Sequence, residues 1–337
     1  MNLAITGTGA VSPAGWGVEA LMETLRSGTI PAVSLLERRC GEGTVTTPVL
    51  RVPADNGRVP KSPRLRRTSP ISKFAAAAAM EALGETRLAQ IAEGLRVGVI
   101  FTLSNGCVNY SNRFFGEVLA DPAMASPILF PETVFNAPSS HLSAMIGSTA
   151  PNDSLIGDGS GFLTGIDLAA EWLERGDVDG CLVVASEEID WLSAEGLRLF
   201  SRNLVPSEGA GAIYLDRGEG PAIIEALPDP VSFTGRKRMD AAFRLRCDLS
   251  ITDDGNTLLV DSRSGIRSFD EAETAMWRDW EGPAWSPKKL LGDSMGATAA
   301  FQVVAAVESL KSGSWKQAVV SSMGWNQQCA AMVLSKA

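Results

Sequence analysis

The sequence predicts an α/β fold, because short apolar segments typical of buried strands alternate along the chain with segments typical of helices. The clearest unit is "SLIGDGSGFLTGIDLAAEWLERGD", residues 154–177, which reads as the end of a strand, a glycine turn and a helix. A similar turn and helix recur less regularly at residues 292–311, and an apolar strand follows each copy. The repetition predicts two related βαβ-type halves.

The other elements follow from the same patterns. The chain opens with an apolar strand that breaks into a turn containing glycine and proline. Helical segments are expected at residues 18–28, 71–85, 137–147, 268–280 and 295–313. Apolar runs predict strands at residues 95–103, 180–190, 209–216, 256–265, 316–326 and 330–337. We place the boundary between the halves in "RGEGP", which gives an N-terminal unit 1–217 and a shorter C-terminal unit 218–337.

Composition limits the function. A net charge of -9 argues against nucleic acid as a partner, because phosphate binding requires a positive field. The five cysteines are far apart and lack CxxC spacing, so we expect reduced thiols, no metal site and a cytoplasmic location. The N-terminus does not have the features of a signal peptide, and no apolar run is long enough to predict a membrane span.

Five segments, in this order, resemble the β-ketoacyl synthases, the condensing enzymes of fatty acid and polyketide assembly. They are "ITGTGAVSPAGWGVEALMETLRSG", "RRTSPISKFAAAAAMEAL", "FNAPSSHLSAMIG", "RGDVDGCLVVASEE" and "SEGAGAIYLD". Together they cover most of residues 1–216, whereas the match fails over residues 221–257. The resemblance implies a thiolase-like fold, in which two related halves form a five-layered α-β-α-β-α arrangement, and it implies no cofactor.

The resemblance also implies where catalytic residues would stand, and this chain lacks them. The family uses a cysteine thiolate at a helix start and two histidines that donate hydrogen bonds to the developing enolate. The cysteine position falls on Gly159, and the histidine positions fall on Ser262 and Asp293. The family's lysine is retained as Lys288. Glycine offers no nucleophile and an ionised aspartate would repel an enolate, so we expect no condensing activity.

Ser160 neighbours the cysteine position and is the alternative nucleophile. Its surroundings, Asp-Gly-Ser-Gly, do not match the G-x-S-x-G elbow of hydrolases. A serine enzyme would also need a base, and the only histidine, His141, lies in the "FNAPSSHLSAMIG" segment. The simpler interpretation is that Asp158 and Ser160 cap the helix that follows.

Two further sets of residues follow from the resemblance. Trp325 and Asn326 replace residues of the family's flexible loop near the C-terminus, and with Lys288 they are expected to line or gate an acyl pocket. The basic run 61–73 contains Arg64, Arg66 and Arg67, which could contact an acidic acyl carrier protein, although a charge run is more often a solvated face.

These observations leave three hypotheses. The first is a catalytically silent homologue resembling a chain length factor, which forms a heterodimer with an active ketosynthase in type II fatty acid, polyketide or aryl polyene biosynthesis. The second is an enzyme that hydrolyses, transfers or decarboxylates acyl thioesters through Ser160, Asp293 or His141. The third is a scaffold homodimer without catalysis.

Overall fold

The computed structural model describes residues 3–251, 254–325 and 327–337. Its main feature is one large sheet with two halves of matching design. The first half, in spatial order, contains β1 (Ala4–Ser12), β8 (Gly209–Asp216), β7 (Gly180–Glu187), β5 (Val97–Leu103) and β6 (Asn152–Ile156). The second half contains β9 (Ala222–Ala226), β14 (Gln328–Lys336), β13 (Gln317–Met323), β11 (Thr257–Val260) and β12 (Ala284–Trp285).

The two halves repeat the same pairing pattern. In each half, counted from the centre of the sheet, two antiparallel pairings are followed by two parallel ones. The halves meet where β1 pairs antiparallel with β9, through Ala4 with Ile223 and Ile5 with Ala222. This correspondence confirms the two related halves that the repeated turn and helix predict.

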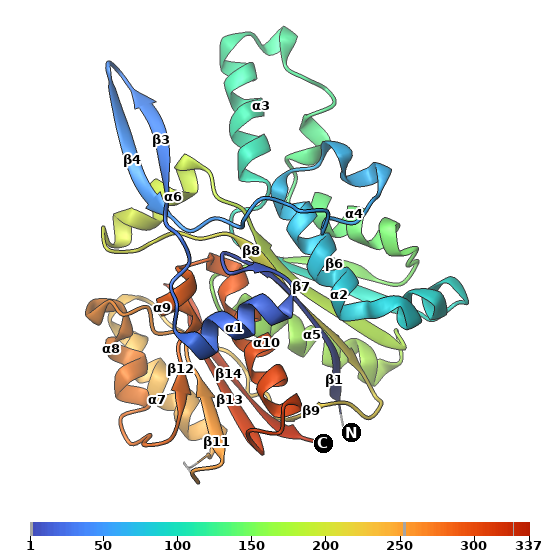
Figure 1. Ribbon diagram of the computed structural model, residues 1–337, viewed down its shortest axis with the longest axis vertical. Coiled ribbons are helices and arrows are strands. Elements are labelled where there is room, and N and C mark those ends of the chain that lie inside the picture. The colour runs from blue at the N-terminus through green and yellow to red at the C-terminus, as the bar shows by residue number, and fades with distance from the viewer. Residues whose placement is uncertain (1–2, 252–253, 326) are drawn as a thin grey trace.

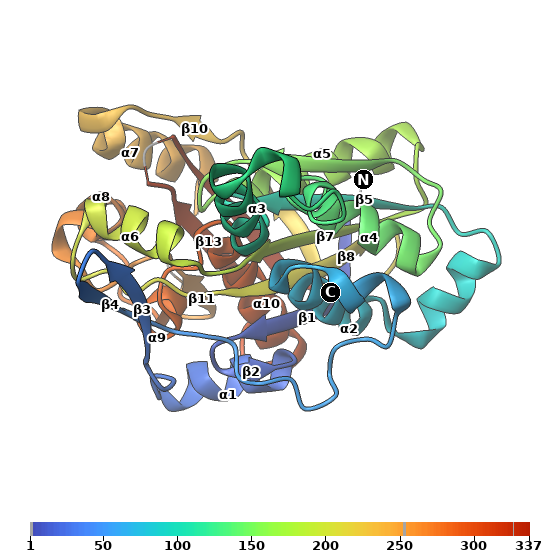
Figure 2. The same cartoon turned by 90° about the horizontal axis from the view of Figure 1, so that it is seen from above.

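Helices and sheet halves form five layers (Figures 1 and 2). The outer layer on the first half contains α2 (Pro70–Ala92) and α4 (Ala137–Ile146). The middle layer contains α5 (Gly161–Arg175) and α10 (Thr298–Lys311), which pack between the two halves. The outer layer on the second half contains α7 (Arg238–Leu249) and α8 (Arg267–Met276). The five-layered thiolase-like arrangement is therefore confirmed.

The sequence explains why α10 lies in the middle. A helix that faces solvent is apolar on one side only, whereas a helix that is apolar all round must be buried. In α10 every residue from Thr298 to Val307 is buried. The polar side chain of Gln302 within this stretch donates hydrogen bonds to the backbone carbonyls of Val260 and Ser321. Burying a large aliphatic or aromatic side chain stabilises the fold by about 1.5–3 kcal/mol, so this helix contributes much of the central core.

Three elements outside the predicted set project from the layers. They are the hairpin β3–β4 (Ser34–Cys40, Gly43–Val49), α3 (Val108–Ala120) and α6 (Trp191–Phe200). Figure 1 shows the hairpin and α3 extending from the same end of the molecule. Arg38 on the hairpin donates two hydrogen bonds, of 2.8 and 2.7 Å, to Glu195 on α6, so the hairpin is held against that helix.

Several predicted elements differ in extent from the observed ones, and two differ most. The strand predicted at residues 256–265 ends at Val260, because Asp261 then accepts the backbone N–H of Arg263 and turns the chain. The helix predicted at 71–85 continues to Ala92, with a break at Gly84, where φ is 65°. The remaining elements are α1 (Val18–Ser27), α9 (Pro287–Leu291), two short strands, β2 (Gly15–Trp16) and β10 (Val231–Ser232), and five single 3-10 turns. Over the described residues, no helix combines the length and apolar character needed to cross a membrane.

Candidate active site

The glycine turn between β6 and α5 lies next to Ser322 and Met295, which are chain neighbours of residues in the site. The φ angle of Gly159 lies outside the left-handed region that favours glycine. Its carbonyl accepts a hydrogen bond of 3.2 Å from the Ser322 hydroxyl. A Cβ atom added at Gly159 would lie 3.5 Å from the Met295 carbonyl oxygen, which is an ordinary contact. The turn therefore has room for a side chain where the sequence supplies none.

Ser160 is fully buried, and its hydroxyl is engaged. It donates to Asp158 Oδ1 at 3.0 Å and also lies 3.4 Å from the Gln328 carbonyl oxygen. Ser160 is the N-cap residue of α5, but its side chain makes no capping hydrogen bond, and Asp158 instead accepts the Ser160 N–H. The predicted capping role of the Ser160 hydroxyl is therefore wrong, and this hydroxyl faces a carboxylate rather than an open cavity.

Ser262 follows β11 and belongs to a buried cluster around Glu273 of α8. Its hydroxyl donates to Glu273 Oε2 at 2.6 Å and accepts the backbone N–H of Met323 at 2.8 Å. Glu273 also accepts the Ser321 hydroxyl. Burial, with a contribution from the Asp261 carboxylate, raises the pKa of Glu273 to about 7. Ser262 thus serves as a link between α8 and β13 rather than as a free donor.

Lys288 and Asp293 form a buried ion pair at the next wall. The Lys288 Nζ atom lies 3.1 Å from Asp293 Oδ2, and the two side chains are 8% and 1% exposed. Asp293 Oδ1 accepts the backbone N–H of Met295, the residue whose carbonyl lies beside Gly159. Removing either partner of a buried pair leaves an uncompensated charge, so the two residues stabilise each other.

Trp325 closes the site. Its ring packs against Phe269, with centroids 4.8 Å apart, and against Phe200 at 5.3 Å, and the Lys288 ammonium lies 5.4 Å from its centroid. The pocket behind it measures only about 10 Å³, enough for roughly one water molecule. Asn326, predicted with Trp325 to line the gate, lies outside the described residues.

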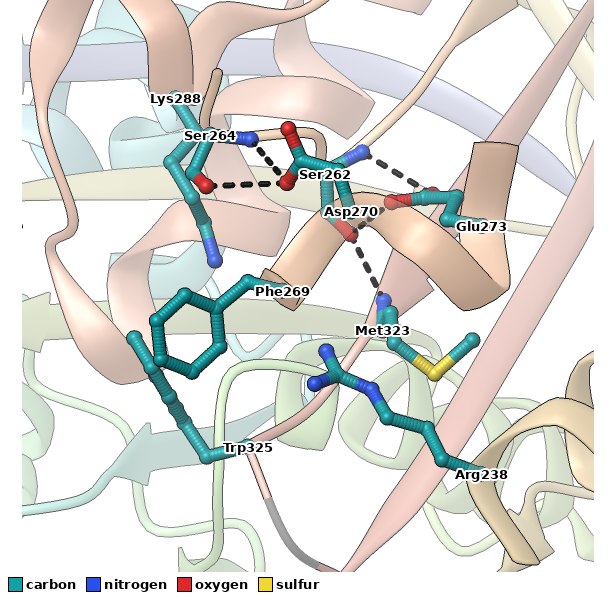
Figure 3. Close-up of a pocket in the computed structure, with 9 residues that line it drawn as sticks. All are labelled: Arg238, Ser262, Ser264, Phe269, Asp270, Glu273, Lys288, Met323 and Trp325. Atoms are coloured by element: carbon teal, nitrogen blue, oxygen red, sulfur yellow. Dashed lines mark hydrogen bonds between the residues drawn. The ribbon is translucent and has the colours of Figure 1, made fainter. Parts of the chain in front are cut away.

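Of the residues that line this pocket, the sequence predicted Ser262, Lys288 and Trp325 as site residues, and Glu273 and Arg238 are among those it missed. Glu273 lies on α8 between buried Ala272 and Met276, so helical spacing could have placed it on the inner face. Arg238 begins α7, in the segment where the family resemblance fails. Figure 3 shows Arg238 and Lys288 pointing into the pocket from opposite sides. Within the described chain the Arg238 guanidinium has no hydrogen-bond or ion-pair partner, and desolvation lowers its pKa.

The other predicted residues lie elsewhere. His141, on α4, is bound to Glu132 at 2.9 Å and does not line the pocket. Arg64, Arg66 and Arg67 lie on the 3-10 turn η1 (Pro63–Arg67), and all three are exposed. The structure therefore brings Gly159, Ser262, Lys288, Asp293 and Trp325 together and separates them from the arginines.

Residues 2–220 match the family described as "Beta-ketoacyl synthase, N-terminal domain". The chain belongs to the β-ketoacyl synthase family. No curated protein matches the chain.

Solved β-ketoacyl synthase structures share its whole fold at low identity. The ishigamide ketosynthase/chain length factor structure matches with a TM-score of 0.80 and 19% identity, covering 100% of this chain and 99% of that one. A ketosynthase in complex with its chain length factor from Xenorhabdus doucetiae gives 0.81 and 15%, covering 100% and 98%. A β-ketoacyl synthase from Burkholderia phymatum STM815 gives 0.81 and 16%, covering 100% and 99%.

Condensation by this family requires a thiolate and two neutral donors around one acyl thioester. The pocket of this chain is lined by Ser262, which is bound to Glu273, and by Lys288, which is paired with Asp293. The hydrogen bonds and the ion pair of these groups connect the elements that surround the site.

Proposed function

We propose that this chain is a non-condensing member of the β-ketoacyl synthase family that forms a heterodimer with an active ketosynthase, as a chain length factor does. The pathway would be type II fatty acid, polyketide or aryl polyene biosynthesis in the cytoplasm. The observation that carries the proposal is the buried Lys288–Asp293 pair, because in the proposed assignment it fills a catalytic position with a group that stabilises the fold. Solved relatives that pair a ketosynthase with a chain length factor supply the precedent.

An open sheet edge supports the pairing. β6 ends the first half of the sheet, and among the described strands none pairs with its outer side. Exposed strand edges are templates for pairing with another chain. Ile156 on β6 is 60% exposed. Phe135, just before α4, and Phe115 and Leu119, both on α3, are also exposed. Apolar surface of this kind favours a protein partner.

Co-expression with the ketosynthase encoded beside it tests the pairing. We expect the two proteins to co-purify as a heterodimer, and Ile156→Asp to weaken the complex at least about tenfold by placing a charge at the interface. Phe243→Asp, on the outer face of α7 and 45% exposed, is the matched control and should leave the complex intact. A stable monomer, or a homodimer indifferent to the ketosynthase, contradicts the proposal.

Gly159→Cys tests the proposed silence directly. The added Cβ meets only an ordinary contact, so the variant should fold with nearly unchanged stability. It should gain a thiol but no condensation, because Ser262 and Asp293 still supply no free donors to an enolate. The measurement is product formation from acyl and malonyl carrier proteins. Product from this single variant would show that the two histidine positions are misassigned.

The alternative function, thioester processing through Ser160, is tested by mass spectrometry after incubation with an acyl carrier protein. We expect no acyl adduct, because the Ser160 hydroxyl is buried and bound to Asp158. An adduct that disappears in Ser160→Ala would favour the alternative.

Charge reversal of Arg64, Arg66 and Arg67 together, followed by carrier-protein titration, tests whether these exposed arginines form the carrier contact.

A further inference from the structure

The edge of β1 that faces away from β8 is only partly covered by other strands. At one end of this edge β9 pairs antiparallel with β1, through Ile5 and Ala222. At the other end β2 pairs antiparallel with Val11 and Ser12. In the part of the chain that the structure describes, no strand pairs with residues 6–10 on this side. The sheet therefore has a short gap here, with a strand at each end.

A mainly polar cavity of about 350 Å³ lies along this gap. β1 forms its floor, and the second half of α2 and the last turns of α10 form its walls. Pro221, just before β9, also lines it. The cavity shares no lining residue with the pocket behind Trp325, so it is a separate space.

The backbone of β1 presents hydrogen-bonding groups to this cavity. The Ala10 N–H donates to the Glu81 carboxylate at 3.0 Å, and the Ala10 carbonyl accepts the Gly17 N–H at 2.8 Å, so both groups point away from β8. In an antiparallel pair this direction alternates from one residue to the next, so the backbone groups of Thr8 point the same way as those of Ala10. Thr8 lines the cavity. Its N–H and carbonyl therefore face a space in which another strand would lie.

The end of the gap nearest β9 is positively charged. Arg87 of α2 donates to the Thr6 carbonyl at 3.2 Å and to the Thr6 hydroxyl at 2.6 Å. Its guanidinium also lies 4.4 Å from the centroid of the Tyr214 ring and 4.0 Å from the Asp216 carboxylate, and these contacts fix its position. A guanidinium has more N–H donors than these contacts use, so Arg87 can also bind a carboxylate in the cavity.

The end of the gap nearest β2 is negatively charged. Glu81 of α2 lies there, bound to the Ala10 N–H. Glu308 of α10 lines the same cavity, where it accepts the Thr8 hydroxyl at 2.6 Å and pairs with Lys311 at 3.4 Å. Desolvation raises the pKa of Glu81, and the Glu308 carboxylate raises it further. An ammonium group placed beside Glu81 would offset both effects.

We propose that this gap binds a short extended peptide of about three residues, antiparallel to β1. The middle residue of the peptide exchanges two hydrogen bonds with the N–H and carbonyl of Thr8, as in strand addition. The antiparallel direction places the peptide ammonium at Glu81 and the peptide carboxylate at Arg87, which matches the charge at each end of the gap. The site goes beyond the proposed pairing with a ketosynthase and does not depend on it.

The length of the gap sets the length of the peptide. A strand rises about 3.3 Å per residue, so Thr6 and Ala10 lie about 13 Å apart and an extended tripeptide spans about 10 Å. The hydrogen bonds at its two termini account for the difference. Because β9 and β2 occupy the ends of the edge, a longer peptide finds no further edge to pair with.

Triglycine is the probe, because side chains opposite Gly7 and Gly9 would point at α2. A Cβ added at Gly7 would lie only 2.0 Å from the Ala82 carbonyl oxygen, so the helix backbone lies close over this face of β1. Titration of the full-length chain, followed by ligand-observed NMR, measures binding. We expect triglycine to bind saturably, and acetyl-triglycine and triglycine amide, which each lack one charged end, to bind about tenfold more weakly.

A fourth peptide tests the strand pairing itself. Glycyl-sarcosyl-glycine keeps both charged ends but has a methyl group in place of the middle N–H, so it cannot donate to the Thr8 carbonyl. We expect it to bind at least about fivefold more weakly than triglycine. Equal binding of these two peptides overturns the proposal, and so does a failure of triglycine to bind.

Arg87→Gln and a matched control test the position of the carboxylate. Arg87→Gln should weaken triglycine about tenfold but leave triglycine amide unchanged, because the amide has no carboxylate for Arg87 to bind. Arg175→Gln, at an exposed arginine that also has an aspartate partner, should change neither affinity. Equal weakening of both peptides by Arg87→Gln, or of triglycine by both variants, contradicts the site. The peptide series with the unmodified chain gives an independent test if Arg87→Gln does not fold.

Discussion

Glu273 shows how one buried residue can set the response of this protein to pH. In the folded chain its pKa is raised to about 7 by burial, against an ordinary value of 4.5. Between these two values the folded state holds a proton that the unfolded state has lost. The free energy of unfolding therefore falls as pH rises from about 4.5 to about 7. Glu187, buried at the end of β7 with a pKa raised to about 8, acts in the same direction over the wider range from about 4.5 to about 8.

Glu273→Gln should flatten that part of the profile. The amide cannot ionise, so the fall in Tm between pH 4.5 and 7 should become smaller, even if the lost hydrogen bonds lower Tm at every pH. Thermal unfolding followed by circular dichroism across this range measures the slope. Glu219→Gln, at an exposed position, is the control and should leave the slope unchanged. An unchanged slope in Glu273→Gln contradicts the assignment.

Among the elements, α2 has a break in its helical backbone that the sequence only partly predicts. Gly84 has φ 65° and ψ 170° inside the helix, in a region that residues with a side chain rarely adopt. No atom lies within 4 Å of a Cβ added there, so the constraint comes from the backbone alone. Gly84→Ala should lower the free energy of unfolding by about 1–2 kcal/mol.

Gly116 in α3 provides the comparison for Gly84. It has no positive φ, and it too has open space around an added Cβ. Gly116→Ala should therefore stabilise the protein by up to about 1 kcal/mol through helix propensity. Urea unfolding of both variants measures the two changes. Equal effects, in sign and size, would show that the Gly84 backbone is not under constraint.

The elements also show how far sequence reasoning reaches. The strands of the large sheet have continuous apolar runs, and α5 and α10 have buried faces and glycine turns, so the local pattern and the packing agree. The sequence did not predict the hairpin β3–β4 and α6, because their exposed apolar residues follow no regular period. These elements are held by a tertiary contact, the hydrogen bonds between Arg38 and Glu195. In the site, Arg238 could not be predicted, because it reaches the pocket only through the tertiary placement of α7.

For the whole molecule, the middle layer joins the two halves into a single core. The central cluster includes Ile5 and Phe162 from the first half and Val303, Val320 and Met332 from the second. We therefore expect units 1–217 and 218–337 to be two repeats that share one core, and we expect neither to fold alone. The apolar face of each half is buried only when the other half covers it.

A chain that ends after residue 217 tests this dependence. It would lack β9 and α10 and would expose the inner faces of β1, β8 and α5, where Ile5, Ile213 and Phe162 are at most 1% exposed in the full chain. We expect this fragment to be insoluble, or to bind a hydrophobic dye and unfold without a cooperative transition, because exposed core surface of this extent promotes association. The full chain should show a single cooperative transition in the same assay. A soluble fragment with a sharp transition would instead mean that the first half contains a self-sufficient core, and that the central layer stabilises the second half only.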